Sequence, residues 1–552
     1  MLLRLACILL CTTALSAQSR SAAANPAQQG YRIAGTVVNA LTGQPIPSVS
    51  VAIARTTLGM DRDISKSVMT GADGRFSFTG LADGKYSLMA TARGFTLQYF
   101  EHHDPYATAI AVGPNLDADQ LVFRLQPDAS IEGTVSDENS DPIQNALVRL
   151  FQRSTEAGQQ KTVPASQAQT DDQGHYRIGH LSPGTYYLAV SARPWYAQNV
   201  RMPKRSSTSD SEARSTQDAL ALDVTYPLTF YPDAADSADA SPLLLKPGEK
   251  ATADIALHAT PSLHLRIRTG ETRPGGDVLG RMVFPQISQR IFEGYLDAVF
   301  NAPDSWAAPG VIEISGLAPG HYVVEINDKG GERGWYRELD LTGDTEITAA
   351  DGPRFVPLDG SIVFDNGRRP PRESSIQLSN PETGETFRSD IDEKGSFDFR
   401  SDDVRPGRYL VALENANGFF LYKLSATGAK VAGHTLEISG ATGVHISAVA
   451  SYGAGQVDGT ALREGEPFAG AMIVLVPQDP ANNSALFRRD QSDSDGTFTL
   501  ANVVPGQYSV IAIANGWDLE WANPTVLQPY LKDGEIVQVP LDGKLQIKVQ
   551  IQ

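Results

Sequence analysis

The chain has 552 residues, a formal net charge of −18 at neutral pH, and a composition that is 41% hydrophobic and 20% charged. Single hydrophobic cores stop growing at roughly 250 residues, so a chain of this length divides into several domains. The negative charge disfavours nucleic acids and anionic membranes as partners, because both are polyanions that bind clustered Lys and Arg.

Residues 1–24 have the layout of a secretory signal peptide. Arg4 supplies a positive charge, an apolar stretch follows it, and small residues come next. This apolar stretch is shorter than the roughly 20 residues of a membrane-spanning helix, and we expect no membrane span in the rest of the chain. We therefore expect cleavage and export to the periplasm, the cell surface or the medium. The two cysteines, Cys7 and Cys11, both lie in this segment, so the mature chain would form no disulfide.

After this segment, one strand–turn–strand pattern recurs five times. Each copy has a glycine followed by a segment such as "GRFSF", then a short turn such as "SPG", and then a tyrosine that opens another alternating segment. Alternation with a period of two predicts half-buried strands. The paired glycines of the five copies are Gly74 and Gly84, Gly174 and Gly184, Gly310 and Gly320, Gly395 and Gly407, and Gly496 and Gly506.

A further landmark, a glycine followed by Thr or Ser, opens four of the copies. The third copy has only "LHLRIRT" at this place, and the second contains a polar insertion at 201–219. Because whole domains recur, we expect five β-sandwiches arranged as beads on a string. The predicted domains are 30–126, 127–260 with the polar loop insertion, 261–353 as a degenerate sandwich, 354–449 and 450–552.

The residues of the turn phrase predict its backbone conformation. In "VVPGQYSV", Pro505 would fix φ at the first central position of a type II turn, and Gly506 would take the positive φ that the second position requires. The tyrosine after the turn, Tyr508 in this copy, resembles the tyrosine corner of β-sandwiches, in which a phenol satisfies nearby backbone.

The combined pattern "G-T-V … P-I-x-x-A-x-V … D-x-x-G-x-Y-x-I-x-x-L-x-P-G-x-Y-x-L" resembles the carboxypeptidase regulatory-like domain. The resemblance implies an all-β fold: a tandem array of about five transthyretin-like or Ig-like antiparallel β-sandwich domains. In that family the domain is a non-catalytic accessory module, grouped with carbohydrate-binding-like folds.

Three short motifs contain residue types that bind metals, and each is incomplete. His434 and Glu437 fit H-x-x-E, but the only downstream histidine, His445, follows too closely for a zinc site. The sequence "HHDP" at 102–105 offers two histidines without a third ligand. "DQSDSDG" at 490–496 lacks two positions of a calcium loop and is more typical of a turn. We therefore expect neither a metal nor another cofactor, and no enzymatic activity.

Each copy ends its late strand with aromatic residues, in segments such as "RPWYAQ" and "NGWDLEW". Such rings can stack on the apolar faces of sugars, or they can cover the open end of a core. The candidate carbohydrate-binding residues are Trp195, Tyr196, Trp335, Tyr336, Trp517 and Trp521.

These observations favour a non-catalytic exported binding protein whose partner is a polysaccharide or a surface glycan. Two alternatives remain: a structural spacer or adhesive stalk, and an accessory subunit that docks on another exported protein. The link from a carbohydrate-binding-like fold to carbohydrate binding is an analogy, so it favours the first interpretation only by a small margin.

Overall fold

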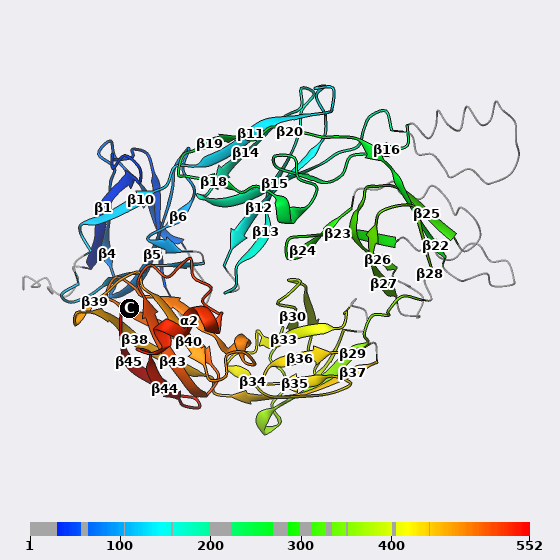
Figure 1. Ribbon diagram of the computed structural model, residues 1–552. Coiled ribbons are helices and arrows are strands. Elements are labelled where there is room, and N and C mark those ends of the chain that lie inside the picture. Colours follow the sequence, from blue (N-terminus) through cyan, green and yellow to red (C-terminus); the bar gives the residue numbers. More distant parts are fainter. Residues whose placement is uncertain are drawn as a thin grey trace, which may run out of the picture.

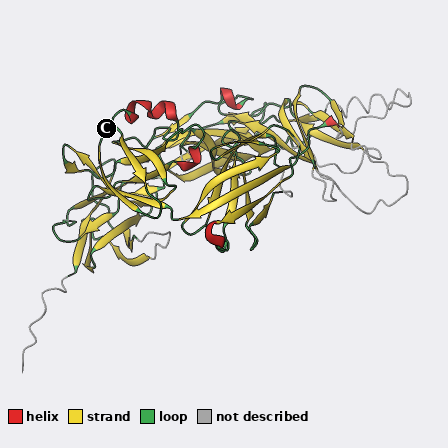
Figure 2. Cartoon of the chain, turned by 90° about the horizontal axis from the view of Figure 1, so that it is seen from below, coloured by secondary structure: helices red, strands yellow, loops and turns green. Residues whose placement is uncertain are grey.

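The computed structural model describes residues 30–56, 64–103, 105–116, 118–155, 158–197, 222–268, 285–298, 311–326, 334–348, 351–399, 404–440 and 442–552. The predicted signal peptide, Gly310 and the polar insertion at 201–219 lie outside these ranges. The described residues form paired β-sheets with very little helix (Figure 2). Each pair encloses a hydrophobic core, so the chain is a tandem array of β-sandwiches, numbered 1 to 5 here in chain order.

Sandwich 1 packs the sheet β10-β1-β4 against the sheet β3-β2-β5-β6, with β9 also paired to β5. A small hairpin, β7-β8, extends from it. The strands are β1 (Tyr31–Asn39), β2 (Ser50–Arg55), β3 (Ile64–Met69), β4 (Arg75–Leu81), β5 (Gly84–Thr91), β6 (Gln98–Tyr99), β7 (His102–His103), β8 (Tyr106–Ala107), β9 (Ile110–Val112) and β10 (Leu121–Leu125).

Sandwich 2 packs β14-β11-β19, with β20 beside β11, against β13-β12-β15-β17, with β18 beside β15. A further two-stranded sheet pairs β16, which lies between β15 and β17 in the chain, with β21 after β20. The elements are β11 (Ala129–Ser136), β12 (Leu147–Ser154), β13 (Lys161–Gln169), β14 (His175–Leu181), β15 (Gly184–Ser191), β16 (Val224–Thr225), β17 (Thr229–Phe230), η2 (Ser237–Asp239), β18 (Leu243–Leu245), β19 (Lys250–Thr252), β20 (Ile255–Ala256) and β21 (Thr260–Pro261).

Sandwich 3 pairs β25-β22-β28 with β24-β23-β26-β27, and sandwich 4 pairs β32-β29-β37-β34 with β31-β30-β33-β36-β35. The elements of sandwich 3 are β22 (Leu263–Arg268), β23 (Pro285–Ile291), β24 (Gly294–Asp297), β25 (Val311–Leu317), β26 (Gly320–Ile326), β27 (Trp335–Leu341) and β28 (Thr345–Thr348). Those of sandwich 4 are β29 (Leu358–Phe364), η4 (Asp365–Gly367), β30 (Ser375–Ser379), β31 (Thr386–Asp390), β32 (Ser396–Asp398), β33 (Gly407–Glu414), β34 (Phe419–Thr427), β35 (Lys430–Ala432), β36 (Thr435–Ile438) and β37 (Val444–Tyr452).

Sandwich 5 pairs β39-β38-β42, with β45 beside β38, with β41-β40-β43-β44. Its elements are β38 (Gly455–Arg463), β39 (Glu466–Pro467), β40 (Met472–Pro477), η5 (Ser484–Leu486), β41 (Arg488–Gln491), β42 (Thr497–Val503), β43 (Gly506–Ile513), α2 (Pro524–Leu531), β44 (Glu535–Val539) and β45 (Lys544–Gln550). Every side chain of β40 is buried, because α2 and the loop before it cover the face of the sheet that points away from the sandwich core.

The same topology recurs in all five sandwiches. The opening strand pairs in antiparallel fashion with the strand that precedes the turn phrase, and in parallel with the last strand. In sandwich 3 the opening strand is β22, the "LHLRIRT" segment, which takes this position without the glycine landmark. Where the landmark is present, as at Gly133, an added Cβ would lie 2.2 Å from the carbonyl oxygen of Ala253, which connects β19 and β20.

The tyrosine corner predicted from the turn phrase is present in every copy. Each phenol donates a hydrogen bond to the backbone carbonyl four residues earlier, across the turn, and the Tyr508 hydroxyl lies 2.8 Å from the Val504 oxygen. The other four bonds join Tyr86 to Ala82, Tyr186 to Ser182, Tyr322 to Ala318 and Tyr409 to Arg405. Burial raises the pKa of Tyr508 to about 12.

The prediction of a type II turn at this phrase is wrong. Gly506 has φ 158°, close to extended, and Gly184 has no positive φ. Both residues begin a strand instead, because each pairs directly with a neighbouring strand, Gly506 with Val539 and Gly184 with Leu245. The left-handed glycines are those upstream, such as Gly174 with φ 73°.

The five sandwiches follow one another around a ring, so that sandwich 5, in red, lies beside sandwich 1, in blue (Figure 1). Side-chain and backbone hydrogen bonds join these two sandwiches directly. Each sandwich has its own core, as the sequence predicts, but the array is not an open string, because its two end sandwiches contact each other.

Candidate binding surfaces

Trp195 and Tyr196 follow β15 at an edge of sandwich 2. The Trp195 side chain is 90% exposed and meets the Tyr196 ring edge-on, with the ring centroids 5.7 Å apart. The Tyr196 hydroxyl donates to Glu138 Oε1 at 3.0 Å, and Glu138 lies in a turn fixed by the buried Asp137 carboxylate, which accepts two backbone N–H bonds. This pair thus combines an open aromatic face with carboxylate acceptors.

Trp335 and Tyr336 lie at the start of β27 in sandwich 3, and their rings are engaged within the protein. Trp335 is 8% exposed and belongs to the core of this sandwich. Tyr336 stacks on Phe355, with centroids 5.3 Å apart, and lies beside the Arg405 guanidinium of sandwich 4. Neither ring has the free position at an open edge that the sequence pattern predicts.

Trp517 and Trp521 lie in the loop before α2, and this loop faces other sandwiches. The Trp517 indole stacks on His103 of sandwich 1, with centroids 4.5 Å apart and planes 7° apart. Trp521 Nε1 donates to the Thr155 carbonyl of sandwich 2 at 3.1 Å, and both indoles lie over the Arg489 guanidinium. The prediction that the two rings project from a free edge is wrong, because their faces make contacts between sandwiches.

Carbohydrate binding by the six aromatic residues stays a prediction. Because the other four rings are engaged within the protein, the candidates narrow to Trp195 and Tyr196. Sequence reasoning could not separate these two from the other four, since all follow a late strand in similar segments. Trp335 is buried in the core of its own sandwich. Tyr336, Trp517 and Trp521 contact a neighbouring sandwich, which a pattern within one repeat does not encode.

The residues of the incomplete metal motifs make other contacts. His434 Nε2 lies 3.0 Å from the Leu421 carbonyl oxygen, and His445 pairs with Asp359 at 2.6 Å. Burial lowers the pKa of His103, which lies between sandwiches 1 and 5. Among the residues that the structure describes, no group of three or more His, Cys, Asp or Glu side chains could hold a metal ion.

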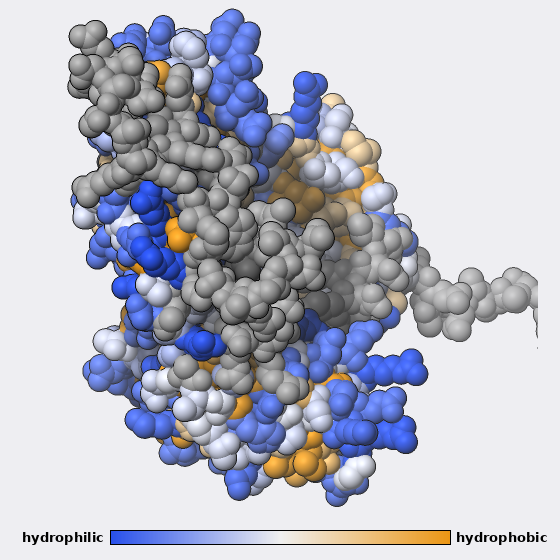
Figure 3. Space-filling view, turned by 90° about the vertical axis from the view of Figure 1, so that its right-hand side faces the viewer, coloured by the Kyte–Doolittle hydropathy of each residue, from blue (hydrophilic) through white to orange (hydrophobic). Residues whose placement is uncertain are grey.

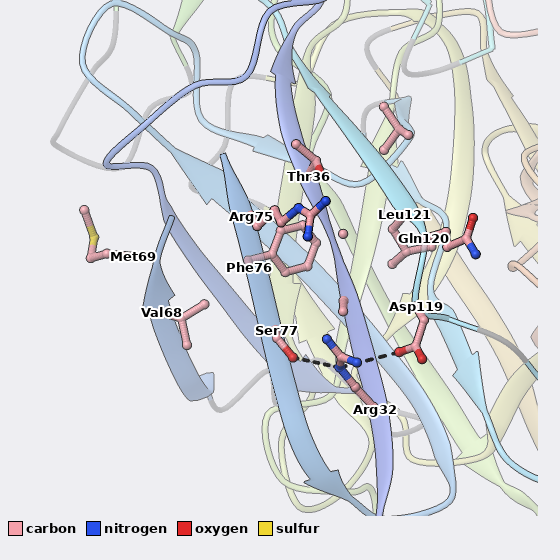
Figure 4. A pocket seen from close by; sticks show the side chains of 13 residues that line it. Arg32, Thr36, Val68, Met69, Arg75, Phe76, Ser77, Asp119, Gln120 and Leu121 are labelled. Carbon is pink, nitrogen blue, oxygen red and sulfur yellow. Dashed lines mark hydrogen bonds and ion pairs between the residues drawn. The ribbon is translucent and has the colours of Figure 1, made fainter. Parts of the chain in front are cut away.

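A hollow of about 620 Å³ lies over the outer face of sandwich 1, along β4, β1 and β10 (Figure 4). Arg32 crosses it and contacts Ser77 and Asp119, and the exposed Met69 and Val122 stand at its sides. It therefore combines apolar side chains with two arginines, Arg32 and Arg75, that are already paired. On the side of the ring formed by sandwich 3, the described surface is mostly hydrophilic with small apolar patches (Figure 3).

Two stretches of the chain, residues 32–125 and 130–258, match the carboxypeptidase regulatory-like domain. Sandwiches 1 and 2 are therefore domains of this type, as the sequence pattern predicts. No curated protein matches the chain. No helix among the described residues is long and apolar enough to cross a membrane.

Several solved structures are similar to the chain at low sequence identity. The Bacillus anthracis TIE protein is 10% identical, with 96% of this chain and 76% of that chain covered and a TM-score of 0.17. GBS52, the minor pilin of Streptococcus agalactiae, is 13% identical, with 42% and 97% covered and a TM-score of 0.22. The shaft pilin SpaA of Lactobacillus rhamnosus GG is 9% identical, with 42% and 98% covered and a TM-score of 0.19.

Proposed function

We propose that the chain is a non-catalytic exported protein that binds a polysaccharide or a surface glycan through Trp195 and Tyr196. The exposed Trp195 indole is the observation that carries this proposal. An apolar ring left almost fully in water costs free energy, which a ligand with an apolar face recovers when it stacks there. Sugar rings present such a face on their C–H side, and their hydroxyl groups can donate to the Glu138 carboxylate beside Tyr196.

Export rests on the signal-peptide layout of residues 1–24. The proposal of a non-catalytic role rests on the regulatory-like domains and on a chemistry of aromatic stacking and hydrogen bonding, which binds a sugar without transforming it.

The test is retention of the mature chain on insoluble polysaccharides, followed by titration with soluble fragments of any that bind. Trp195→Ala should weaken binding by about fivefold, since a stacked exposed ring contributes on the order of 1 kcal/mol. Tyr422→Ala is the matched control, because Tyr422 is also an exposed aromatic residue, 66% exposed, on sandwich 4. If no polysaccharide retains the parent chain, or if Trp195→Ala binds as well as the parent, the proposal fails.

A second candidate function is docking on another exported protein, and the hollow of sandwich 1 favours it. Met69, at the end of β3 in the other sheet, is 62% exposed there, and Val122, on the same sheet as Arg32, is 47% exposed. Exposed apolar side chains ringed by charged groups are typical of protein-binding surfaces. A spacer or stalk is less favoured, because contact between sandwiches 1 and 5 brings the two ends of the array together.

A further inference from the structure

The contact between sandwiches 1 and 5, called the clasp here, is built from polar groups that match one another. It consists of Lys85, His103, Thr108, Ala109 and Ala111 on sandwich 1, and Arg489, Gln491, Asp493, Ser494, Asp495, Thr497 and Trp517 on sandwich 5.

The backbone of sandwich 1 near β9 forms hydrogen bonds with Asp493 and Ser494 of sandwich 5. The Ala109 amide donates to Asp493 Oδ1 at 2.9 Å, and the Ala109 carbonyl accepts from the Ser494 amide at 3.0 Å. The Ala111 amide donates to Ser494 Oγ at 2.8 Å. Buried backbone groups are costly to leave unpaired, so this loop supplies partners that sandwich 1 lacks within its own sheets at these positions.

A buried amide makes a second set of bonds. Gln491 is 2% exposed, and its Nε2 donates to the Glu101 carbonyl at 2.7 Å and to Thr108 Oγ1 at 2.8 Å. Its Oε1 lies 3.1 Å from His103 Nδ1, and the His103 ring stacks on Trp517. All these contacts cross from one sandwich to the other, so the Gln491 side chain depends on sandwich 1 for its hydrogen bonds.

Lys85 supplies the charge of the clasp. Its Nζ lies 2.5 Å from Asp493 Oδ2, 2.5 Å from Thr497 Oγ1 and 3.8 Å from Asp495 Oδ1. The three charged side chains are between 16% and 32% exposed, so solvent screens them only in part. The aspartates of "DQSDSDG", which the sequence offers as an incomplete calcium loop, thus surround an ammonium group from another domain.

The joint between sandwiches 2 and 3 combines polar contacts, such as the Thr162 amide that donates to Glu293 Oε2 at 2.9 Å, with an apolar cluster. There Phe292 of sandwich 3 packs its ring against Phe151, Tyr187 and Phe230 of sandwich 2. Apolar contacts of this type tolerate charge changes nearby, whereas hydrogen-bonded charge pairs are strongly weakened when one partner is removed.

We propose that the clasp is a charge-dependent docking surface on sandwich 5 whose partner is sandwich 1 of the same chain, and that Lys85 holds it closed. Losing the Lys85 charge opens the ring at this contact and leaves the sandwiches folded, because Lys85 contributes to no hydrophobic core. The partner is the same chain rather than a second copy, because the loop of Trp521 also contacts sandwich 2, which follows sandwich 1 directly.

The experiment measures the distance between the two end sandwiches in the full mature chain. Both natural cysteines lie in residues 1–24, so Ser67→Cys and Ile536→Cys would give the mature chain two labelling sites for energy transfer, at exposed positions on sandwiches 1 and 5. Lys85→Glu and Asp493→Lys should each lose the short-distance population, since removing one partner of such a pair weakens an interface by about 30-fold or more. Lys85→Arg should keep the short distance.

Arg75→Glu is the matched control, because it reverses a charge on sandwich 1 whose ion pair among the described residues is local, with Asp73. Far-UV spectra and melting curves identify any variant that fails to fold. The two charge reversals lie on different sandwiches, so one of them still tests the proposal if the other fails to fold. An unchanged distance in both folded reversal variants would overturn the proposal. Transfer that appears only between separately labelled copies would overturn it too, because the partner would then be a second chain.

Discussion

The tyrosine of the repeated phrase makes the same hydrogen bond in each sandwich, and this explains why one chain carries the phrase five times. The phenol spans the sharp bend before the strand and satisfies a carbonyl that no strand partner reaches. The repeat therefore encodes a structural corner and not a binding motif.

Removing one of these hydroxyls should destabilise one sandwich. Tyr508→Phe keeps the ring in the core but leaves the Val504 carbonyl without its donor, at a cost of about 1 to 2 kcal/mol. Denaturant unfolding of the full chain should show an earlier transition for sandwich 5 alone. Tyr422→Phe, which alters an exposed hydroxyl, should change nothing measurable.

The buried corner tyrosines should also make the fold sensitive to alkali. Burial raises the pKa of Tyr186, Tyr322, Tyr409 and Tyr508 to about 12. The unfolded phenol ionises near pH 10 and the folded one does not, so this stability is complete below pH 10 and is lost as the pH rises towards 12. Each group contributes on the order of 2 kcal/mol. Melting temperatures that stay level between pH 9 and pH 11 would contradict this.

Two glycines of sandwich 2 should respond differently to the same change. Gly174 has φ 73°, and a Cβ there would lie 2.5 Å from the Val135 carbonyl oxygen, so Gly174→Ala should cost about 1 to 3 kcal/mol. Gly184 has no positive φ, and a Cβ would meet only side-chain atoms at 3.2 Å or more, so Gly184→Ala should cost much less. Equal losses of unfolding free energy in the two variants, measured with denaturant, would show that the left-handed conformation of Gly174 does not make this position more sensitive to a Cβ.

At the scale of strands and helices, alternation and turn residues predicted the sandwiches but not every element. The third copy lacks the Gly-Thr landmark, yet β22 takes the opening position, because pairing with β25 and β28 depends on alternating apolar residues more than on the glycine. The strand β40 reads as a continuous apolar run because both its faces are covered, which alternation alone cannot indicate. The helix α2 that covers it has a weak pattern and an internal proline.

The side chain of Leu527 should contribute much of the free energy that holds α2 against the sheet. It is fully buried between the helix and the outer face of the sheet, so Leu527→Ala should cost about 2 to 4 kcal/mol through lost contacts and a cavity. Gln528→Ala, on the exposed side of the same helix, should have little effect on the melting of sandwich 5. A small loss at Leu527 would mean that the helix is only loosely held.

At the scale of the whole molecule, the residues that join sandwiches were the least predictable. A sequence pattern within one repeat reports which side chains face its own core, whereas Trp517, Trp521 and Lys85 contact residues hundreds of positions away. These side chains meet their partners only because the ring of sandwiches closes. No local sequence pattern encodes that closure. The same limit explains why aromatic residues expected at free edges occupy joints.

The joint between sandwiches 3 and 4 rests on Arg405, which is 9% exposed. Its guanidinium pairs with Glu325 and Glu385 and lies over the rings of Tyr295 and Tyr336, 5.0 and 5.3 Å from their centroids. Arg405→Ala leaves two largely buried carboxylates without their cation, and we expect sandwiches 3 and 4 to lose about 3 to 5 kcal/mol.

A compensating pair distinguishes the charge from the packing at this joint. In the double variant Arg405→Met and Glu325→Met, apolar side chains replace both partners of the closest ion pair. Part of the loss should be recovered, because Glu325 is no longer a buried charge without its cation, while the more exposed Glu385 stays unpaired. Calorimetry measures the recovery. The unfolding transitions of sandwiches 3 and 4 should shift together, while the transition of sandwich 1 should stay constant. A double variant as unstable as Arg405→Ala would show that the loss comes not from the unpaired Glu325 carboxylate but from Glu385 or from the contacts of the guanidinium with the two tyrosines. Methionine can replace the bulk of the guanidinium there but not its cation–π attraction.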